Sequence, residues 1–63
     1  MKLKDFFKVC YLDSVTIWFM CQHITIKPSD YSTTNFSDWT NKPDDLEVSR
    51  FTYDENGFHV YVR

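Results

Sequence analysis

The sequence predicts a single α+β domain in which a short N-terminal helix packs on one face of a mainly antiparallel sheet of about four strands. Three observations lead to this fold. Apolar residues near the N-terminus recur at helical spacing, later segments alternate apolar and polar residues, and an Asn-Gly dipeptide separates the last two of those segments. Because 63 residues can enclose only one core, we expect residues 1–63 to form one domain.

The helix is predicted by apolar residues at i, i+3, i+4 and i+7, which place one apolar stripe along a helix. These residues are Leu3, Phe6, Phe7 and Cys10. A helix of two or three turns is marginal on its own, so docking against the sheet must hold it in place.

Two strands are expected next, because the apolar parity changes within one segment of the chain. Val15, Ile17 and Phe19 occupy odd positions, whereas Ile24 and Ile26 occupy even ones. A regular strand cannot switch faces in this way, so the change requires a bulge or a reversal. We predict two paired strands joined by a turn within residues 20–23.

Residues 28–45 are mostly polar, yet such a long segment within a compact domain is expected to carry some local structure. Phe36 and Trp39 are three residues apart, and Ser37 or Asn35 can cap a helical turn that lays both rings on the core. A second turn is predicted to begin at Pro43.

Residues 46–63 are predicted to form a β-hairpin closed by Asn56-Gly57, the dipeptide that favours a tight type I′ turn. With Glu55 opposite Phe58, Tyr53 would pair with Val60. Alternation then assigns the residues to two faces. The apolar face holds Phe51, Tyr53, Phe58, Val60 and Val62, and the polar face holds Arg50, Thr52, Asp54, His59, Tyr61 and Arg63.

The composition indicates a protein that binds a partner. Six Phe, four Tyr and two Trp supply apolar area for a small core, and some aromatic surface should remain exposed. We therefore expect a protein partner or a homodimer. The net charge of −2 disfavours nucleic acid, which requires a clustered basic surface. Residues 1–27 carry +2 and residues 28–63 carry −4, an imbalance that a solvated surface explains equally well.

The sequence does not indicate an enzyme, a cofactor or a metal ion. Cys10, Cys21, His23 and His59 lack the paired spacing of zinc ligands, and the chain has no glycine-rich phosphate loop. With no export signal, both cysteines are expected to be free, partly buried thiols.

No membrane association is expected either. The apolar segment of residues 15–26 is interrupted by polar residues and is shorter than the roughly 20 residues that span a bilayer. We expect a protein of the cytoplasm of a bacterial cell.

Partner contacts are expected at three places. The polar face of the hairpin mixes an aromatic residue with long hydrogen-bonding side chains, and a solvated sheet face would look similar. The acidic loop can steer a charged partner, and an exposed Trp marks a contact site. The candidate residues are Arg50, Thr52 and Tyr61 on the hairpin, Asp44, Asp45 and Glu47 in the loop, and Trp39; Trp18 is the other Trp considered.

The order of the motifs in residues 1–9, 13–17, 46–51 and 57–62 resembles small proteins carried by phages and mobile elements of Gram-positive bacteria. Residues 28–45 depart from that pattern. The resemblance implies a protein without catalytic residues. Some phage products of similar size inhibit host defence, so the expected function is occlusion of a host protein, such as a CRISPR effector, in the manner of an anti-CRISPR.

Two other functions remain open at this point. Lys2, Lys4, Lys8 and Lys27 could bind single-stranded nucleic acid together with stacking aromatic residues. The chain could instead be a structural phage component that associates with itself. Salt-dependent oligonucleotide binding would identify the first function, and self-association without a host partner would identify the second.

Overall fold

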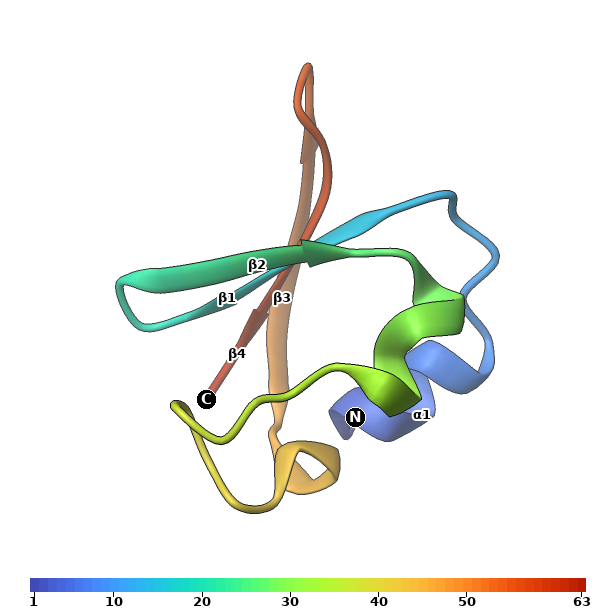
Figure 1. Ribbon diagram of the computed structural model, residues 1–63. Coiled ribbons are helices and arrows are strands. Elements are labelled where there is room, and N and C mark those ends of the chain that lie inside the picture. Colours follow the sequence, from blue (N-terminus) through green and yellow to red (C-terminus); the bar gives the residue numbers. More distant parts are fainter.

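The computed structural model describes all 63 residues and confirms the α+β class. The elements follow in the order α1 (Leu3–Lys8), β1 (Val15–Phe19), β2 (Gln22–Ile26), η1 (Pro28–Thr33), η2 (Pro43–Asp45), β3 (Val48–Asp54) and β4 (Gly57–Val62), where η denotes a 3₁₀ helix (Figure 1). The four strands form one sheet in the order β2-β1-β4-β3. The two hairpins are antiparallel and the central pair, β1 with β4, is parallel, so the sheet is mixed.

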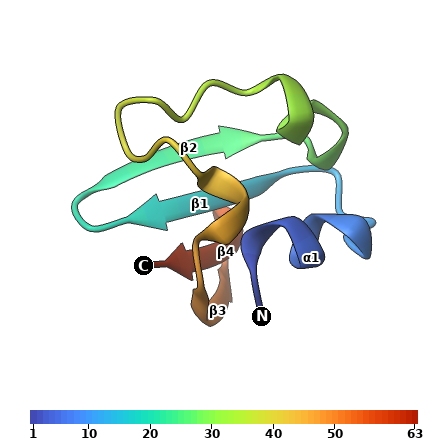
Figure 2. The same cartoon turned by 90° about the horizontal axis from the view of Figure 1, so that it is seen from below.

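The helices lie in one layer on a single face of the sheet (Figures 1 and 2). The core between the two layers is centred on the parallel pair, where the side chains of Ile17 and Val60 are completely buried. Nine buried apolar residues make up this core: Leu3, Phe6, Val15, Ile17, Ile26, Phe36, Leu46, Val60 and Val62.

Helix α1 is held by contacts outside itself, as its short length requires. No side chain caps its N-terminus. Instead, the backbone N–H of Leu3 donates to the carbonyl of Leu46 at 2.8 Å, and Lys2 forms a β-bridge with Glu47. The helix is shorter than the apolar stripe predicts, because it ends at Lys8 and leaves Cys10 beyond it.

The predicted reversal after β1 is confirmed. Phe19 pairs with Gln22, so Met20 and Cys21 form the turn between β1 and β2. Met20 adopts a positive φ of 57°, a conformation that is uncommon for a residue with a side chain. Cys21 is exposed at this turn, not partly buried as expected, whereas Cys10 is half-buried.

The polar segment between the hairpins contains the two predicted turns. The Asn35 side chain accepts the N–H of Ser37, and the N–H groups of Trp39 and Thr40 donate to the carbonyl of Phe36. Phe36 is buried, and its ring lies 5.5 Å from that of Trp39. The turn that begins at Pro43 is η2. Helix η1 was not predicted.

The C-terminal hairpin forms, but its predicted register is wrong. Asp54 pairs with Gly57 and Tyr53 with Phe58, so each β3 residue meets a β4 residue two positions earlier than predicted. Glu55 and Asn56 are the turn residues, and neither has a positive φ, whereas Gly57 has a φ of 111°.

The Asp54 side chain explains this register, because it accepts the N–H of Asn56 at 2.8 Å. Asp at the first position and Gly at the fourth are typical of a type I turn. A shift of two residues preserves alternation, so the predicted faces remain correct.

Candidate functional site

The two faces of the sheet are covered differently. All helices pack on one face, and no element of the chain covers the other (Figures 1 and 2). The strand registers place side chains from all four strands on this second face. We call it the uncovered face, and its members are Thr16, Trp18, His23, Thr25, Arg50, Thr52, Asp54, His59 and Tyr61.

One row of the uncovered face crosses the whole sheet. Trp18 is directly opposite both His23 and Tyr61, and Tyr61 is directly opposite Arg50. The Trp18 ring lies 4.4 Å from the His23 ring and stacks 6.0 Å from the Tyr61 ring. The Arg50 guanidinium lies 4.2 Å from the centre of the Tyr61 ring, in a cation–π contact. These four residues, which we call the aromatic row, form one continuous surface.

A second row runs beside the aromatic row and is more enclosed. It contains Thr25, Thr16, His59 and Thr52, again directly opposite one another. The Thr16 and Thr25 hydroxyls are 2.8 Å apart and share a hydrogen bond. Thr16 and His59 are buried, although no backbone element covers them. No buried side-chain polar atom of the protein lacks a hydrogen-bond partner, so this row is fully satisfied.

Trp18, His59 and Asp54 form a chain of hydrogen bonds across the uncovered face. The indole Nε1 of Trp18 donates to Nδ1 of His59 at 3.0 Å. Because an indole only donates, Nδ1 must be the acceptor and the imidazole proton must be on Nε2. Nε2 then donates to Oδ1 of Asp54 at 2.9 Å. This bond, with the one from the Asn56 N–H, holds the pKa of Asp54 below its ordinary value.

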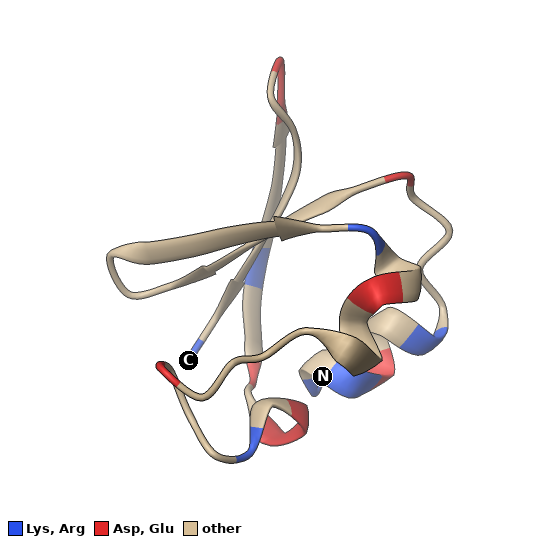
Figure 3. Ribbon diagram, viewed as in Figure 1, with Lys and Arg blue, Asp and Glu red and all other residues tan.

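The charges are distributed unevenly between the two layers. Lysines concentrate on α1, in the helical layer, whereas β3 carries Arg50 and the tip of the hairpin is acidic (Figure 3). Arg50 is therefore the formally charged cation of the aromatic row, and Asp54 is the nearest acid on the uncovered face. Lys2, Lys4 and Lys8 therefore lie on the other side of the sheet from the aromatic row.

The structure brings together three of the seven residues predicted from the sequence. Arg50, Thr52 and Tyr61 lie on the uncovered face. Trp39 lies on the other side of the sheet, where it stacks on Phe19 at 5.6 Å and is half-buried against the core. It is a packing residue in this structure.

The three acidic candidates also lie apart from the aromatic row, near α1 and η2. The Asp44 carboxylate accepts a hydrogen bond from the Tyr31 hydroxyl at 2.6 Å. Burial raises the pKa of Tyr31 most, and this hydrogen bond raises it further. The Asp45 carbonyl accepts from Lys2. Glu47 lies 3.4 Å from both the N-terminal ammonium and the Lys2 ammonium, and these bonds hold its pKa below the ordinary value. Asp45 and Glu47 therefore bind the N-terminus next to the start of β3, whereas Asp44 binds η1.

Trp18, His23 and His59 also belong to the uncovered face, although they are not among the seven predicted contacts. Trp18 was the other Trp considered, and His59 was assigned to the polar face of the hairpin. For Trp18 and His23 a further signal was present in the sequence. Within the first hairpin, Trp18 and His23 alternate with the apolar residues, which assigns them to the face opposite the core. What alternation could not reveal was that β4 lies beside β1 and places Tyr61 against Trp18.

No group of three or more His, Cys, Asp or Glu side chains gathers where it could hold a metal ion. None of the helices combines the length and apolar character that crossing a membrane requires. Comparison with protein-family models, with curated proteins and with solved structures finds no match to this chain.

Proposed function

We propose that this protein is a non-catalytic binding protein that attaches to another protein through the uncovered face and blocks the surface it occupies. The observation that carries the proposal is the aromatic row, in which the half-buried Trp18 and Tyr61 and the exposed Arg50 lie side by side on a sheet face without a covering layer. Trp, Tyr and Arg are the residue types that supply most of the energy of protein interfaces.

The aromatic row is also held in place before any partner arrives. Trp18 is fixed by its bond to His59, and Arg50 is fixed by its contact with Tyr61. Side chains that are already ordered lose less conformational entropy on binding, so more of the contact energy contributes to affinity. The second row, which lies beside the aromatic row and whose buried polar groups all have hydrogen-bond partners, can be covered by a partner without leaving these groups unpaired.

The resemblance to small proteins of phages and mobile elements supports a host defence protein, such as a CRISPR effector, as the partner. The partner surface that fits the aromatic row is an apolar patch with a carboxylate at the end that meets Arg50. Such a surface gains cation–π and ion-pair contacts with Arg50, whose guanidinium is already shielded from water on the side that faces Tyr61.

Single-stranded nucleic acid is the second candidate, because a row of stacked rings beside an arginine also suits bases. The distribution of charge argues against it, because three of the five lysines (Lys2, Lys4 and Lys8) lie in or next to α1, on the helical side of the sheet and away from a backbone laid along the aromatic row (Figure 3). Oligonucleotide affinity that falls steeply between low and moderate salt would favour this candidate instead.

The test is affinity capture from a bacterial lysate with the wild-type chain, the Tyr61→Ala variant and the Tyr11→Ala variant. Tyr11 is 95% exposed and is not on the uncovered face, so it is the matched control. We expect one host protein to be captured by the wild type and by Tyr11→Ala, and its recovery to fall at least about tenfold with Tyr61→Ala, as for an interface hot spot. Equal recovery with all three chains would refute the proposal.

A further inference from the structure

The free edge of β3 is a second surface without a partner, separate from the aromatic row. β3 is an outer strand of the sheet, and its start is covered because the N–H of Val48 donates to the carbonyl of Met1 at 2.8 Å. Beyond Val48 no backbone hydrogen bond from another segment reaches the outer edge of β3, the edge opposite β4. The hairpin of β3 and β4 extends past the rest of the sheet, so this part of the edge is accessible (Figure 1).

The backbone groups at this open edge belong to Phe51 and Tyr53. Glu47 and Arg63 exchange both backbone hydrogen bonds, which fixes the alternation along β4. Tyr61, His59 and Gly57 therefore face β3, and their partners Arg50, Thr52 and Asp54 face β4 in return. The N–H and C=O groups of Phe51 and Tyr53, which alternate with these residues along β3, point to the open edge, where an added strand would bind them.

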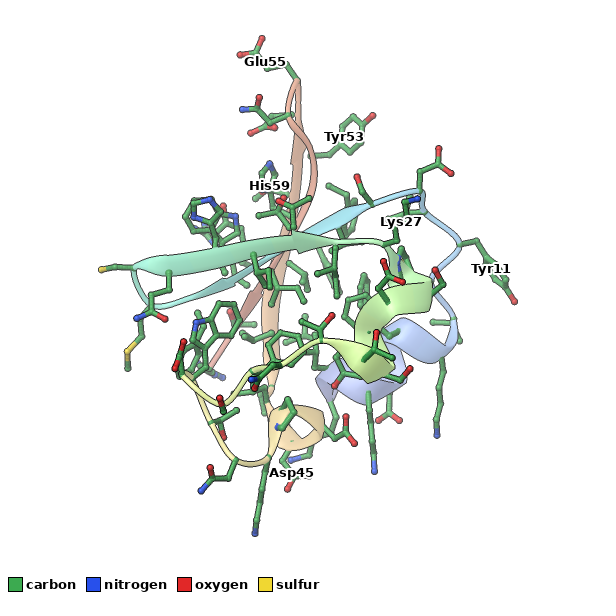
Figure 4. The ribbon with its side chains drawn as sticks, viewed as in Figure 1. Tyr11, Lys27, Asp45, Tyr53, Glu55 and His59 are labelled. Atoms are coloured by element: carbon green, nitrogen blue, oxygen red, sulfur yellow. The ribbon has the colours of Figure 1, made fainter.

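The side chains at the same edge are aromatic and poorly covered. Tyr53 is 75% exposed and Phe51 is 45% exposed, although both have the parity of the core face. Helix α1 reaches only Phe51, whose ring lies 5.5 Å from that of Phe6. Tyr53 projects into solvent from one side of the hairpin while His59 lies on the other (Figure 4). An exposed edge beside uncovered aromatic surface is typical of a strand-pairing site.

We propose that this edge pairs with the same edge of a second copy of the chain, antiparallel and with the two-fold axis at Thr52. The register is self-complementary. It places Arg50 opposite Asp54 of the second copy, Phe51 opposite Tyr53, and Thr52 opposite Thr52. Each chain thus contributes both an arginine and an acid to two identical ion pairs on the uncovered face, and both aromatic pairs lie on the core face.

Both charged groups are available for these ion pairs. Oδ1 of Asp54 accepts the bonds from Asn56 and His59, and Oδ2 has no partner. The Arg50 side chain is exposed, and its contact with Tyr61 uses the face of the guanidinium, which leaves the N–H groups at the edge free. Opposite charges directly across an antiparallel pair stabilise it, and like charges destabilise it.

The pairing joins two sheets of four strands into one continuous sheet and keeps the two aromatic rows on the same side. Met1 covers the edge at Val48, which limits the pairing to the segment from Arg50 to Asp54. Because so short a segment buries less than the roughly 1,600 Å² of a standard interface, the dimer is expected to form reversibly as the concentration rises.

The test is sedimentation equilibrium of the full chain from micromolar to millimolar concentration. We expect the mass to rise from 7.6 kDa toward twice that value. The Tyr53→Lys variant should remain monomeric, and the matched Tyr11→Lys variant should dimerise as the wild type does. A wild-type chain that is monomeric throughout would overturn the proposal and leave the edge to an extended strand of another protein. Dimerisation that survives Tyr53→Lys would overturn it as well.

A charge exchange tests the register itself. Arg50→Asp and Asp54→Arg each place like charges opposite one another, so each variant should be monomeric. Their equimolar mixture should form a heterodimer, because every opposed pair then carries opposite charges. Circular dichroism of each variant establishes that it is folded. A mixture of folded variants that stays monomeric would contradict this register. Tyr53 lies on the opposite face from Tyr61, so the result for Tyr53→Lys is independent of those for the proposed function.

Discussion

Replacing Trp18 by Phe tests whether the chain of hydrogen bonds from Trp18 to Asp54 acts as a structural unit. The substitution keeps an aromatic ring but removes the only donor to Nδ1 of His59. Tyr61→Phe is the matched control, since it also removes one polar group from the aromatic row, and the Tyr61 hydroxyl has no hydrogen-bond partner within the protein.

The magnitude follows from the burial of the acceptor. His59 is only 6% exposed, so Nδ1 loses its bond with limited access to water. A buried acceptor left without a partner costs about 1–3 kcal/mol. Because the smaller Phe ring leaves space beside the half-buried Trp18 position, water can restore part of this loss, and we expect a decrease of about 1–2 kcal/mol in the free energy of unfolding. For a domain of this size, this lowers Tm by about 4–16 °C.

The assay combines urea unfolding, followed by circular dichroism, with long-range ¹H–¹⁵N NMR of the His59 ring. We expect the wild-type spectrum to show the proton on Nε2, as the donated indole bond requires. Tyr61→Phe should change the free energy of unfolding by less than about 0.5 kcal/mol, the usual range for surface substitutions. A proton on Nδ1, or a loss in Trp18→Phe no larger than that in the control, would refute the reasoning.

Four further predictions follow from the core, the turn and the two charged clusters. Ile17→Ala should lower the free energy of unfolding by about 2–5 kcal/mol in urea titrations, because this side chain of the parallel pair is fully buried. Gly57→Ala should cost about 1–2 kcal/mol from its positive φ alone, since a Cβ there meets no other atom. Glu47 has a lowered pKa, so its stabilisation is present above pH 4.5 and is lost as the pH falls, and Glu47→Gln should flatten the stability profile below that pH. Tyr31 has a raised pKa, so its stabilisation is complete below pH 10.0 and is lost above it, and Tyr31→Phe should make unfolding less sensitive to alkali.

The predictable parts of this fold are those encoded by neighbouring residues. Spacing predicts α1, the parity change predicts the turn at Met20 and Cys21, and Pro43 predicts η2. The register of the second hairpin could not be predicted from the Asn-Gly pair alone, because the Asp54 side chain stabilises a competing turn one residue earlier. Local patterns compete at such a site, and the energy difference between turn types is small.

The arrangement of the strands could not be predicted, because the parallel pairing of β1 with β4 joins segments far apart in the sequence. No pattern in the sequence predicts which distant strands pair in this way. Alternation does predict that Arg50, Thr52 and Tyr61 share a face. The complete site required Trp18 and His23 to be placed beside them, and only the strand order provides that.

Trp39 shows the converse limit of reading a sequence for surface residues. A Trp within a polar segment suggests an exposed contact, yet the helical turn after Asn35 directs this ring onto Phe19 and Phe36. Burial of a large ring contributes strongly to the stability of a small domain, so Trp39 packs against the core.

The most direct test of the account is photo-crosslinking from the uncovered face. Benzoylphenylalanine is introduced in place of Tyr61 or, as the control, in place of the exposed Tyr11, and each chain is irradiated in a bacterial lysate. If the uncovered face binds the partner, one host protein is crosslinked from position 61 and not from position 11. Crosslinking of the same protein from position 11 and not from position 61 would contradict it.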